Sequence, residues 1–99
     1  MAKKIVWSPL AIETYEATVS YLLYKFGEAT AKKFVVSVDE RLHLIAARPK
    51  MFRPSQKRKN TFLTSINNKI TLIYRYKPRA RQIELVVFWG MQNPKNKPQ

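Results

Sequence analysis

Three apolar runs separated by turn residues occupy the last third of the chain. They span residues 61–66, 70–76 and 83–89, and each is rich in β-branched or aromatic side chains. Runs of this length and composition predict β-strands. Asn67-Asn68 suits a tight hairpin turn because asparagine tolerates positive φ, and Pro78 belongs to the second turn because proline cannot donate to a central ladder. The pattern therefore predicts an antiparallel meander.

The middle run divides into two sets of alternating positions, which point to opposite faces of a sheet. The mostly apolar set is Ile70, Leu72, Tyr74 and Tyr76. The more polar and basic set is Thr71, Ile73, Arg75 and Lys77. This contrast predicts a sheet that is covered on one side only.

The N-terminal region predicts a short strand over residues 3–7, followed by a helix. Ser8 suits the N-cap, and Pro9 suits the first helical position. An apolar stripe then recurs at helical spacing through Ile12, Tyr15, Val19, Leu22 and Phe26. Gly27 provides a C-terminal stop for this helix.

A second helix is expected to begin near Glu28, whose charge suits a helix N-terminus. Its apolar stripe comprises Ala31, Phe34, Val35, Val38, Leu42 and Ile45. Pro49 ends it, because the residue before proline is disfavoured in α geometry. Residues 48–60 fit neither helix nor strand, and residues 93–99 are expected to form a flexible tail.

These elements predict the α+β class, with the order β-α-α-β-β-β. An N-terminal strand precedes an antiparallel two-helix hairpin, which packs on an antiparallel sheet. The 99 residues suffice for one domain, residues 1–99, with one core. The expected core comprises Leu22, Phe34, Val38, Leu42, Leu72, Tyr74, Leu85 and Val87.

Positive charge is concentrated in the second half of the chain. The sequence holds 19 Lys and Arg against 6 Asp and Glu, for a net charge of +13. Residues 1–47 contain six basic and five acidic side chains, whereas residues 48–99 contain thirteen basic and one acidic. Such a cationic half predicts a polyanionic partner, namely RNA, DNA or an acidic protein segment. A lysine-rich surface that serves only solubility is the plainer alternative.

Composition also excludes several kinds of chemistry. Without cysteine there are no disulfides, thiolate metal sites or cysteine nucleophiles. One histidine cannot form a common zinc site, and two glycines make no phosphate loop, so neither metal nor cofactor is expected. No apolar run approaches the roughly 18 residues of a membrane span, and the N-terminus lacks a signal-peptide pattern. A cytoplasmic protein without membrane contact is expected.

The remaining candidate chemistry is cationic and aromatic. The candidates for contacting a nucleic acid or another target are Lys57, Arg58, Lys59, Arg75, Arg79, Arg81 and Trp89. The cations suit phosphates, and Trp89 suits base stacking, with core packing as its alternative role. Arg75 and Arg81 are the candidates for stabilising a phosphodiester-cleaving transition state, although the catalytic residues remain unassigned. His43 is expected on the flank of the second helix as an exposed residue.

The order of elements and several short segments resemble the RelE/ParE toxins of type II toxin–antitoxin, or plasmid stabilisation, modules. The segments are Val6-Trp7-Ser8-Pro9-Leu10-Ala11, Ala31-Lys32-Lys33-Phe34, Ile73-Tyr74-Arg75-Tyr76 and Ile83-Glu84-Leu85 with Gln92-Asn93-Pro94-Lys95. The resemblance covers nearly the whole chain. It implies a small toxin neutralised by an acidic or amphipathic antitoxin, in a possible hetero-oligomer.

The resemblance leaves two targets open. RelE-type members cut mRNA on the ribosome, and their basic residues fall here near Phe62, Thr64 and Thr71, with a late arginine near Met91 or Gln92. None of these positions is basic, and no tyrosine follows Tyr76. ParE-type members poison DNA gyrase and do not need that set. The sequence therefore favours a ParE-like toxin, and whether it is an enzyme stays open.

Two alternatives accompany this hypothesis. One is an mRNA endoribonuclease whose cations come from other positions, such as Lys57, Lys59, Arg75 and Arg81. The other is a non-toxic module that binds nucleic acid or titrates an antitoxin.

Overall fold

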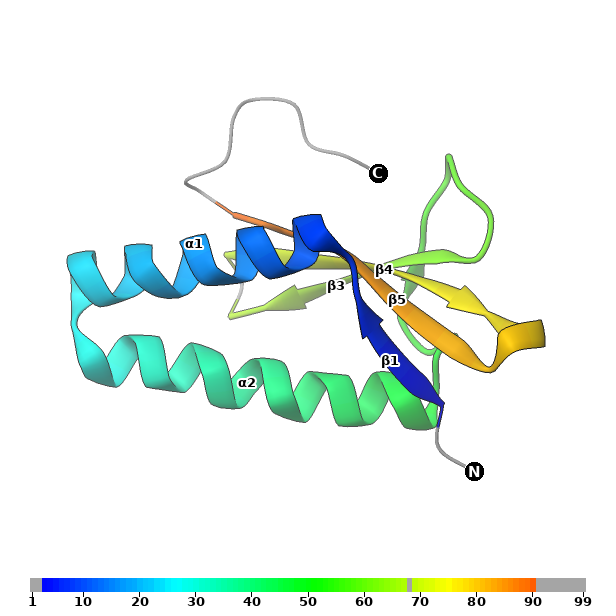
Figure 1. Ribbon diagram of the computed structural model, residues 1–99, viewed down its shortest axis with the longest axis horizontal. Helices are drawn as coiled ribbons and strands as arrows, with labels where there is room; N and C mark the ends of the chain where they lie inside the picture. The colour runs from blue at the N-terminus through cyan, green and yellow to red at the C-terminus, as the bar shows by residue number, and fades with distance from the viewer. Residues whose placement is uncertain (1–2, 68, 91–99) are drawn as a thin grey trace.

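Two helices and five strands make up the part of the chain that the computed structural model describes, residues 3–67 and 69–90 (Figure 1). In chain order the elements are β1 (Lys4–Trp7), α1 (Pro9–Phe26), α2 (Glu28–Ala47), β2 (Arg53–Pro54), β3 (Thr61–Ile66), β4 (Ile70–Lys77), the 3-10 helix η1 (Pro78–Ala80) and β5 (Gln82–Trp89). This is the predicted α+β order with one added strand. The predicted tail, residues 93–99, lies outside the described residues.

The five strands form one mixed sheet in the order β1-β5-β4-β3-β2. The meander β3–β4–β5 is antiparallel as predicted, but β1 pairs with β5 in parallel. Parallel pairing requires a long connection, which the helices and the meander supply. The added strand β2 corrects the expectation of no strand between residues 48 and 60. Its Pro54 lies at the sheet edge, where the missing N–H is tolerated.

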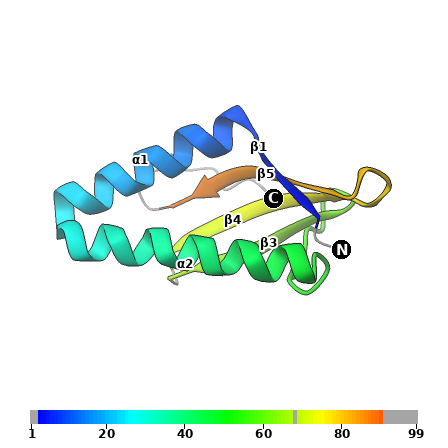
Figure 2. The ribbon, with the colours of Figure 1, turned by 60° about the horizontal axis from the view of Figure 1, so that its bottom comes forward.

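The helix hairpin covers one face of the sheet (Figure 2). Ser8 caps α1, because its Oγ accepts a hydrogen bond of 2.9 Å from the N–H of Ala11. Gly27 links the helices at φ 95°, a conformation that disfavours residues with a Cβ. Among the described residues, no helix is long and apolar enough to cross a membrane.

The main core lies between the hairpin and the sheet. Its buried residues are Ala11, Phe34, Val38, Ile45, Phe62, Ile66, Ile70, Leu72, Tyr74, Ile83, Leu85 and Phe88. Five of the eight predicted core residues are in this set. Leu22 and Leu42 are only partly buried against it, and Val87 is buried in a second cluster.

The buried face of α1 differs from the predicted stripe. Ile12 and Phe26 are 45% and 54% exposed, so their assignment to the stripe was wrong. Instead, the helix buries the small residues Ala11, Thr14 and Thr18. Small side chains allow α1 to lie close to β5. Helical spacing of the large apolar residues located the helix. It did not show that the buried face carries small residues, which allow close packing.

A second, small apolar cluster lies on the other face of the sheet. It consists of Leu63, Ile73 and Val87, with Val86 packed against it. The expectation that this face is simply polar and basic was therefore incomplete. The register between β4 and β5 shifts at Tyr74, which pairs with Leu85, whereas Ile73 pairs with Val87. The extra residue, Val86, is a β-bulge, and it reverses the alternation along the rest of β5.

Candidate functional site

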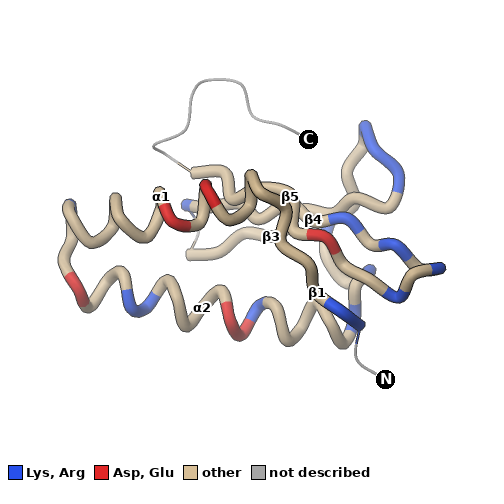
Figure 3. The backbone as a smooth tube through the Cα atoms, viewed as in Figure 1, with Lys and Arg blue, Asp and Glu red and all other residues tan. Residues whose placement is uncertain are grey.

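Cationic residues gather at one end of the molecule. Figure 3 shows Lys and Arg concentrated in the loop before β3 and in the turn between β4 and β5, at the end opposite the link between the helices. The described acidic residues lie on α1 and α2, apart from Glu84 on β5. Most of the described cations from the second half of the sequence thus lie together at one end of the molecule.

A hollow of about 420 Å³ opens on the sheet face that the helices do not cover. Its lining residues are Arg58, Lys59, Thr61, Ile73, Arg75, Glu84, Val86 and Val87. Ile73 and Val87 belong to the second apolar cluster. The hollow therefore combines an apolar patch with charged side chains.

Arg75 occupies the strand at the centre of the hollow. In the sheet register it lies between Thr61 on β3 and Glu84 on β5. All three residues line the hollow, and Arg75 is exposed to solvent. Because a strand fixes the direction of its side chains, Arg75 is the best-positioned cation of this face.

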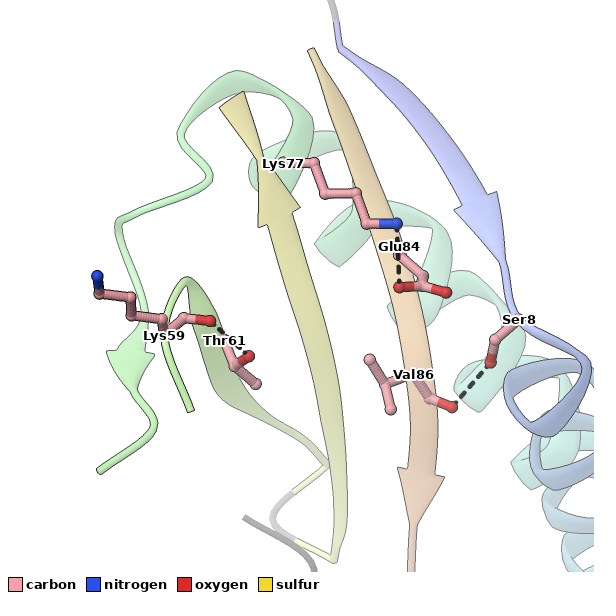
Figure 4. A network of polar contacts seen from close by, with 6 residues as sticks. All are labelled: Ser8, Lys59, Thr61, Lys77, Glu84 and Val86. Atoms are coloured by element: carbon pink, nitrogen blue, oxygen red, sulfur yellow. Dashed lines mark hydrogen bonds and ion pairs between the residues drawn. The ribbon is translucent and has the colours of Figure 1, made fainter. Parts of the chain in front are cut away.

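The bulge brings the β5 residues into the hollow. It allows the consecutive residues Val86 and Val87 to line the same side together with Glu84. The carbonyl of Val86 accepts a hydrogen bond of 2.9 Å from the hydroxyl of Ser8 (Figure 4). Ser8 thus caps α1 and holds the bulge at the same time.

The acidic residue that lines the hollow is paired. Glu84 lies 3.6 Å from the Nζ atom of Lys77 (Figure 4). Among the described residues, no carboxylate lies within ion-pair distance of Arg58, Lys59 or Arg75. The hollow therefore carries an excess of positive charge and attracts an anionic group.

The loop that carries Arg58 and Lys59 is anchored by local hydrogen bonds. Ser55 Oγ accepts bonds of 3.1 and 3.2 Å from the backbone N–H groups of Lys57 and Arg58. Thr61 Oγ1 donates a bond of 3.0 Å to the carbonyl of Lys59 (Figure 4). These contacts restrict the backbone, while the side chains of Arg58 and Lys59 stay exposed.

The other predicted contact residues lie outside this hollow. Lys57 is exposed in the same loop but does not line it. Arg79 and Arg81 are exposed at the turn between β4 and β5. Trp89 is partly exposed at the end of β5, opposite Thr71. The structure brings together Arg58, Lys59 and Arg75 from the predicted set.

Sequence reasoning missed five lining residues, namely Thr61, Ile73, Glu84, Val86 and Val87. Glu84 could have been singled out from the sequence, since it is the only acidic residue in the second half of the chain. The bulge that turns Val86 into the hollow has no comparable signal, because its position depends on the pairing with β4.

The two β3 positions at which the nuclease members carry basic residues, Phe62 and Thr64, do not lie on the open face of the sheet. Phe62 is in the main core, and Thr64 Oγ1 accepts a hydrogen bond from Arg41 of α2, so both face the helices. Strand alternation then places Thr61, Leu63 and Ser65 on the open face, and none is basic. Met91 and Gln92, where the late arginine was sought, lie outside the described residues. His43 is exposed on α2, as predicted.

A two-helix hairpin on a five-strand sheet, with a cationic hollow on the free face, defines a small basic protein of the α+β class. The family model described as ParE toxin of type II toxin-antitoxin system, parDE, matches residues 5–92. The chain therefore belongs to the ParE toxin family. A search of curated proteins found no significant match.

Solved structures share the fold at low sequence identity. The chromosomal ParDE toxin–antitoxin system from P. aeruginosa aligns with a TM-score of 0.73 and 16% identity, over 92% of this chain and 98% of that chain. The E. coli RelBE toxin–antitoxin complex aligns with a TM-score of 0.67 and 8% sequence identity, over 93% of this chain and 100% of that chain. The YoeB dimer from Staphylococcus aureus aligns with a TM-score of 0.63 and 19% sequence identity, over 88% of this chain and 94% of that chain. Both the ParE and the RelE branches of the predicted resemblance thus have this fold.

Proposed function

We propose that this ParE-family protein inhibits growth by binding DNA gyrase and that a cognate antitoxin neutralises it. The observation that carries the proposal is the open face of β3, where Thr61, Leu63 and Ser65 present no basic side chain. Membership of the ParE family supports the same target. In this mechanism the protein acts through the surface it presents and breaks no bond itself.

Metal-free cleavage of RNA makes demands that this face meets poorly. The 2′-hydroxyl must lose a proton, the extra negative charge on the phosphoryl group must be stabilised, and the leaving oxygen must gain a proton. Of the cations on the open face of β4, Arg75 lines the hollow, whereas Lys77 is engaged with Glu84. Arg58 and Lys59 stand on a loop, which fixes side chains less firmly than a strand does.

Binding to a protein makes different demands, which the hollow meets better. Its cations line the same hollow as the apolar residues Ile73, Val86 and Val87. An acidic side chain of the target can pair with the cations, and an apolar side chain beside it can pack against these apolar residues. The hollow therefore fits a protein surface that carries acidic and apolar groups together.

The antitoxin completes the proposal as the neutralising partner. An acidic or amphipathic antitoxin complements the cationic end of the molecule and forms a hetero-oligomer with the toxin. The intact E. coli RelBE toxin-antitoxin complex, one of the solved structures with this fold, supports such a pairing of toxin with antitoxin.

Induced expression with parallel pulse-labelling of DNA and protein synthesis tests the proposal. DNA synthesis should stop first, and primer extension on a reporter transcript should show no codon-phased cuts. A gyrase supercoiling assay with purified protein should show direct inhibition, and Lys25→Ala on α1 serves as a distant control for Arg75→Ala. Codon-phased cuts that disappear with Arg75→Ala would instead establish the endoribonuclease. Normal growth on induction would favour the non-toxic binding module.

A further inference from the structure

A second depression lies at the cationic end, beside the C-terminus of α2. It has a volume of about 490 Å³ and is lined by Lys3, Arg48, Pro49, Lys50, Met51, Tyr76 and Pro78. The start of β1 lies next to the end of α2 in both ribbon views (Figures 1 and 2). Tyr76 packs against the main core, so this depression lies on the helix side of the sheet, away from the hollow around Arg75.

The floor of the depression is apolar and firmly held. Pro49 is buried, and its carbonyl accepts a hydrogen bond of 2.7 Å from the buried hydroxyl of Tyr74. The N–H of Arg48 donates to the carbonyl of Leu44 at 2.8 Å, and the N–H of Met51 donates to the carbonyl of Arg48 at 3.1 Å. These bonds tie the turn after α2 to the helix and to the core. The turn is therefore a preformed platform.

Met51 is an unusual residue for an exposed turn. Its side chain is 46% exposed although it is large and apolar. The thioether is flexible and polarisable, which suits contact with aromatic and aliphatic groups of a partner. With Tyr76 and Pro78, it offers a site for one large apolar side chain.

The rim of the depression is cationic. Lys3, Arg48 and Lys50 line the depression beside its apolar residues. No carboxylate among the residues that the structure describes forms an ion pair with any of the three. Apolar surface bordered by unpaired positive charge complements a large apolar side chain flanked by carboxylates.

We propose that this depression binds an acidic peptide segment of a protein partner. One large apolar side chain of the segment lies against Met51 and Tyr76, and its neighbouring carboxylates pair with Lys3, Arg48 and Lys50. The proposal does not rest on gyrase as the target, because it concerns a different surface. An acidic peptide fits better than single-stranded nucleic acid, because the floor holds one partly buried aromatic ring and no series of stacking platforms.

Fluorescence polarisation and NMR test the proposal with the 99-residue protein. The probe is a fluorescein-labelled peptide, Asp-Glu-Leu-Trp-Glu-Asp, compared with its Asn/Gln form and with a form that has Ser in place of Leu and Trp. The chain has three methionines, so 13C labelling of methionine methyl groups gives a simple spectrum. Met51→Gln assigns the signal of Met51, which reports directly on the depression.

The acidic peptide should shift the Met51 methyl signal and bind more tightly than either altered peptide. Combined Arg48→Ala and Lys50→Ala should weaken its affinity about tenfold or more, whereas the paired substitution Lys32→Ala and Lys33→Ala on α2 should not. Met51→Gln should weaken binding, whereas Leu23→Gln, at a residue that is 50% exposed, should not.

Several outcomes would overturn the proposal. One is a peptide affinity that the combined substitution Arg48→Ala and Lys50→Ala lowers no more than the control pair on α2 does. Another is a Met51 signal that stays in place at saturating peptide. If oligo-dT displaced the peptide and moved the same signal at equal concentration, the depression would be a nucleic-acid site. If the signal moved with protein concentration alone, it would be an interface between copies of this chain.

Discussion

The hydroxyl of Thr14 on α1 accepts a hydrogen bond of 3.0 Å from the backbone N–H of Phe88 on β5. The same hydroxyl donates to the carbonyl of Leu10 at 2.7 Å. Strand β1 pairs with β5 only as far as Leu85. Beyond that point the hydroxyl groups of Ser8 and Thr14 form hydrogen bonds with the backbone of β5. Side chains at the cap and in the first turns of α1 thus replace the backbone partners that β1 provides before Leu85.

Replacing Thr14 with valine tests this helix-to-strand bond. Valine keeps the branched shape but leaves the buried N–H of Phe88 without an acceptor, so the free energy of unfolding should fall by about 1–3 kcal/mol. Urea unfolding followed by circular dichroism measures the loss. Thr30→Val on α2 is the matched control, and equal losses for both variants would show that the bond contributes nothing specific.

The neighbours Ile45 and Leu44 test the assignment of the buried face of α2. Ile45 is fully buried, whereas Leu44 is 47% exposed. Ile45→Ala should cost about 2–5 kcal/mol, because it removes buried methylene groups and leaves a cavity. Leu44→Ala should change the free energy of unfolding by no more than about 0.5 kcal/mol. Similar midpoints of denaturation for the two variants would contradict the packing described above.

Tyr74 predicts a specific dependence of stability on pH. Burial raises the pKa of its hydroxyl well above the usual value of 10.0, so above about pH 10 the unfolded chain loses a proton that the folded protein keeps. Stability should therefore fall as pH rises in that range, by at most about 1.4 kcal/mol per pH unit from this group.

Unfolding free energies measured between about pH 9 and pH 11 should fall less steeply for Tyr74→Phe than for the unaltered protein. Tyr24→Phe, at a side chain that is 88% exposed, should leave the slope unchanged. A slope that is the same in all three proteins would mean that the Tyr74 hydroxyl titrates as in the unfolded chain.

The cationic end predicts how association with the proposed antitoxin responds to salt. Attraction between opposite charges is screened as ionic strength rises, so the association rate should drop markedly between about 50 mM and about 500 mM salt. Neutralising Lys57, Arg58 and Lys59 together should lower the rate at low salt and flatten its salt dependence. Stopped-flow or biosensor kinetics measure both. A rate that does not change with salt would show that charge does not guide this encounter.

Local patterns in the sequence determined both helices, β1 and the three strands of the meander, but not β2. Ser8-Pro9 and Gly27 mark the ends of α1 in the structure as they do in the sequence, because capping and positive φ depend on adjacent residues. Asn67 has φ 61°, as the predicted hairpin turn requires, while Asn68 lies outside the described residues. Pro78 opens the 3-10 turn between β4 and β5. The apolar faces of α2 and β4 were also largely predictable from their periodicity.

The tertiary structure alone decided how these elements meet. Nothing near β1 specifies that it pairs in parallel with β5, because that contact joins residues about eighty positions apart in the chain. The bulge at Val86 depends on the register with β4, and it decides which β5 side chains line the hollow beside Arg75. The depression around Met51 likewise draws on the turn after α2, on β4 and η1, and on Lys3 before β1. Periodicity reports the faces of one element, whereas a site depends on which faces the packing brings together.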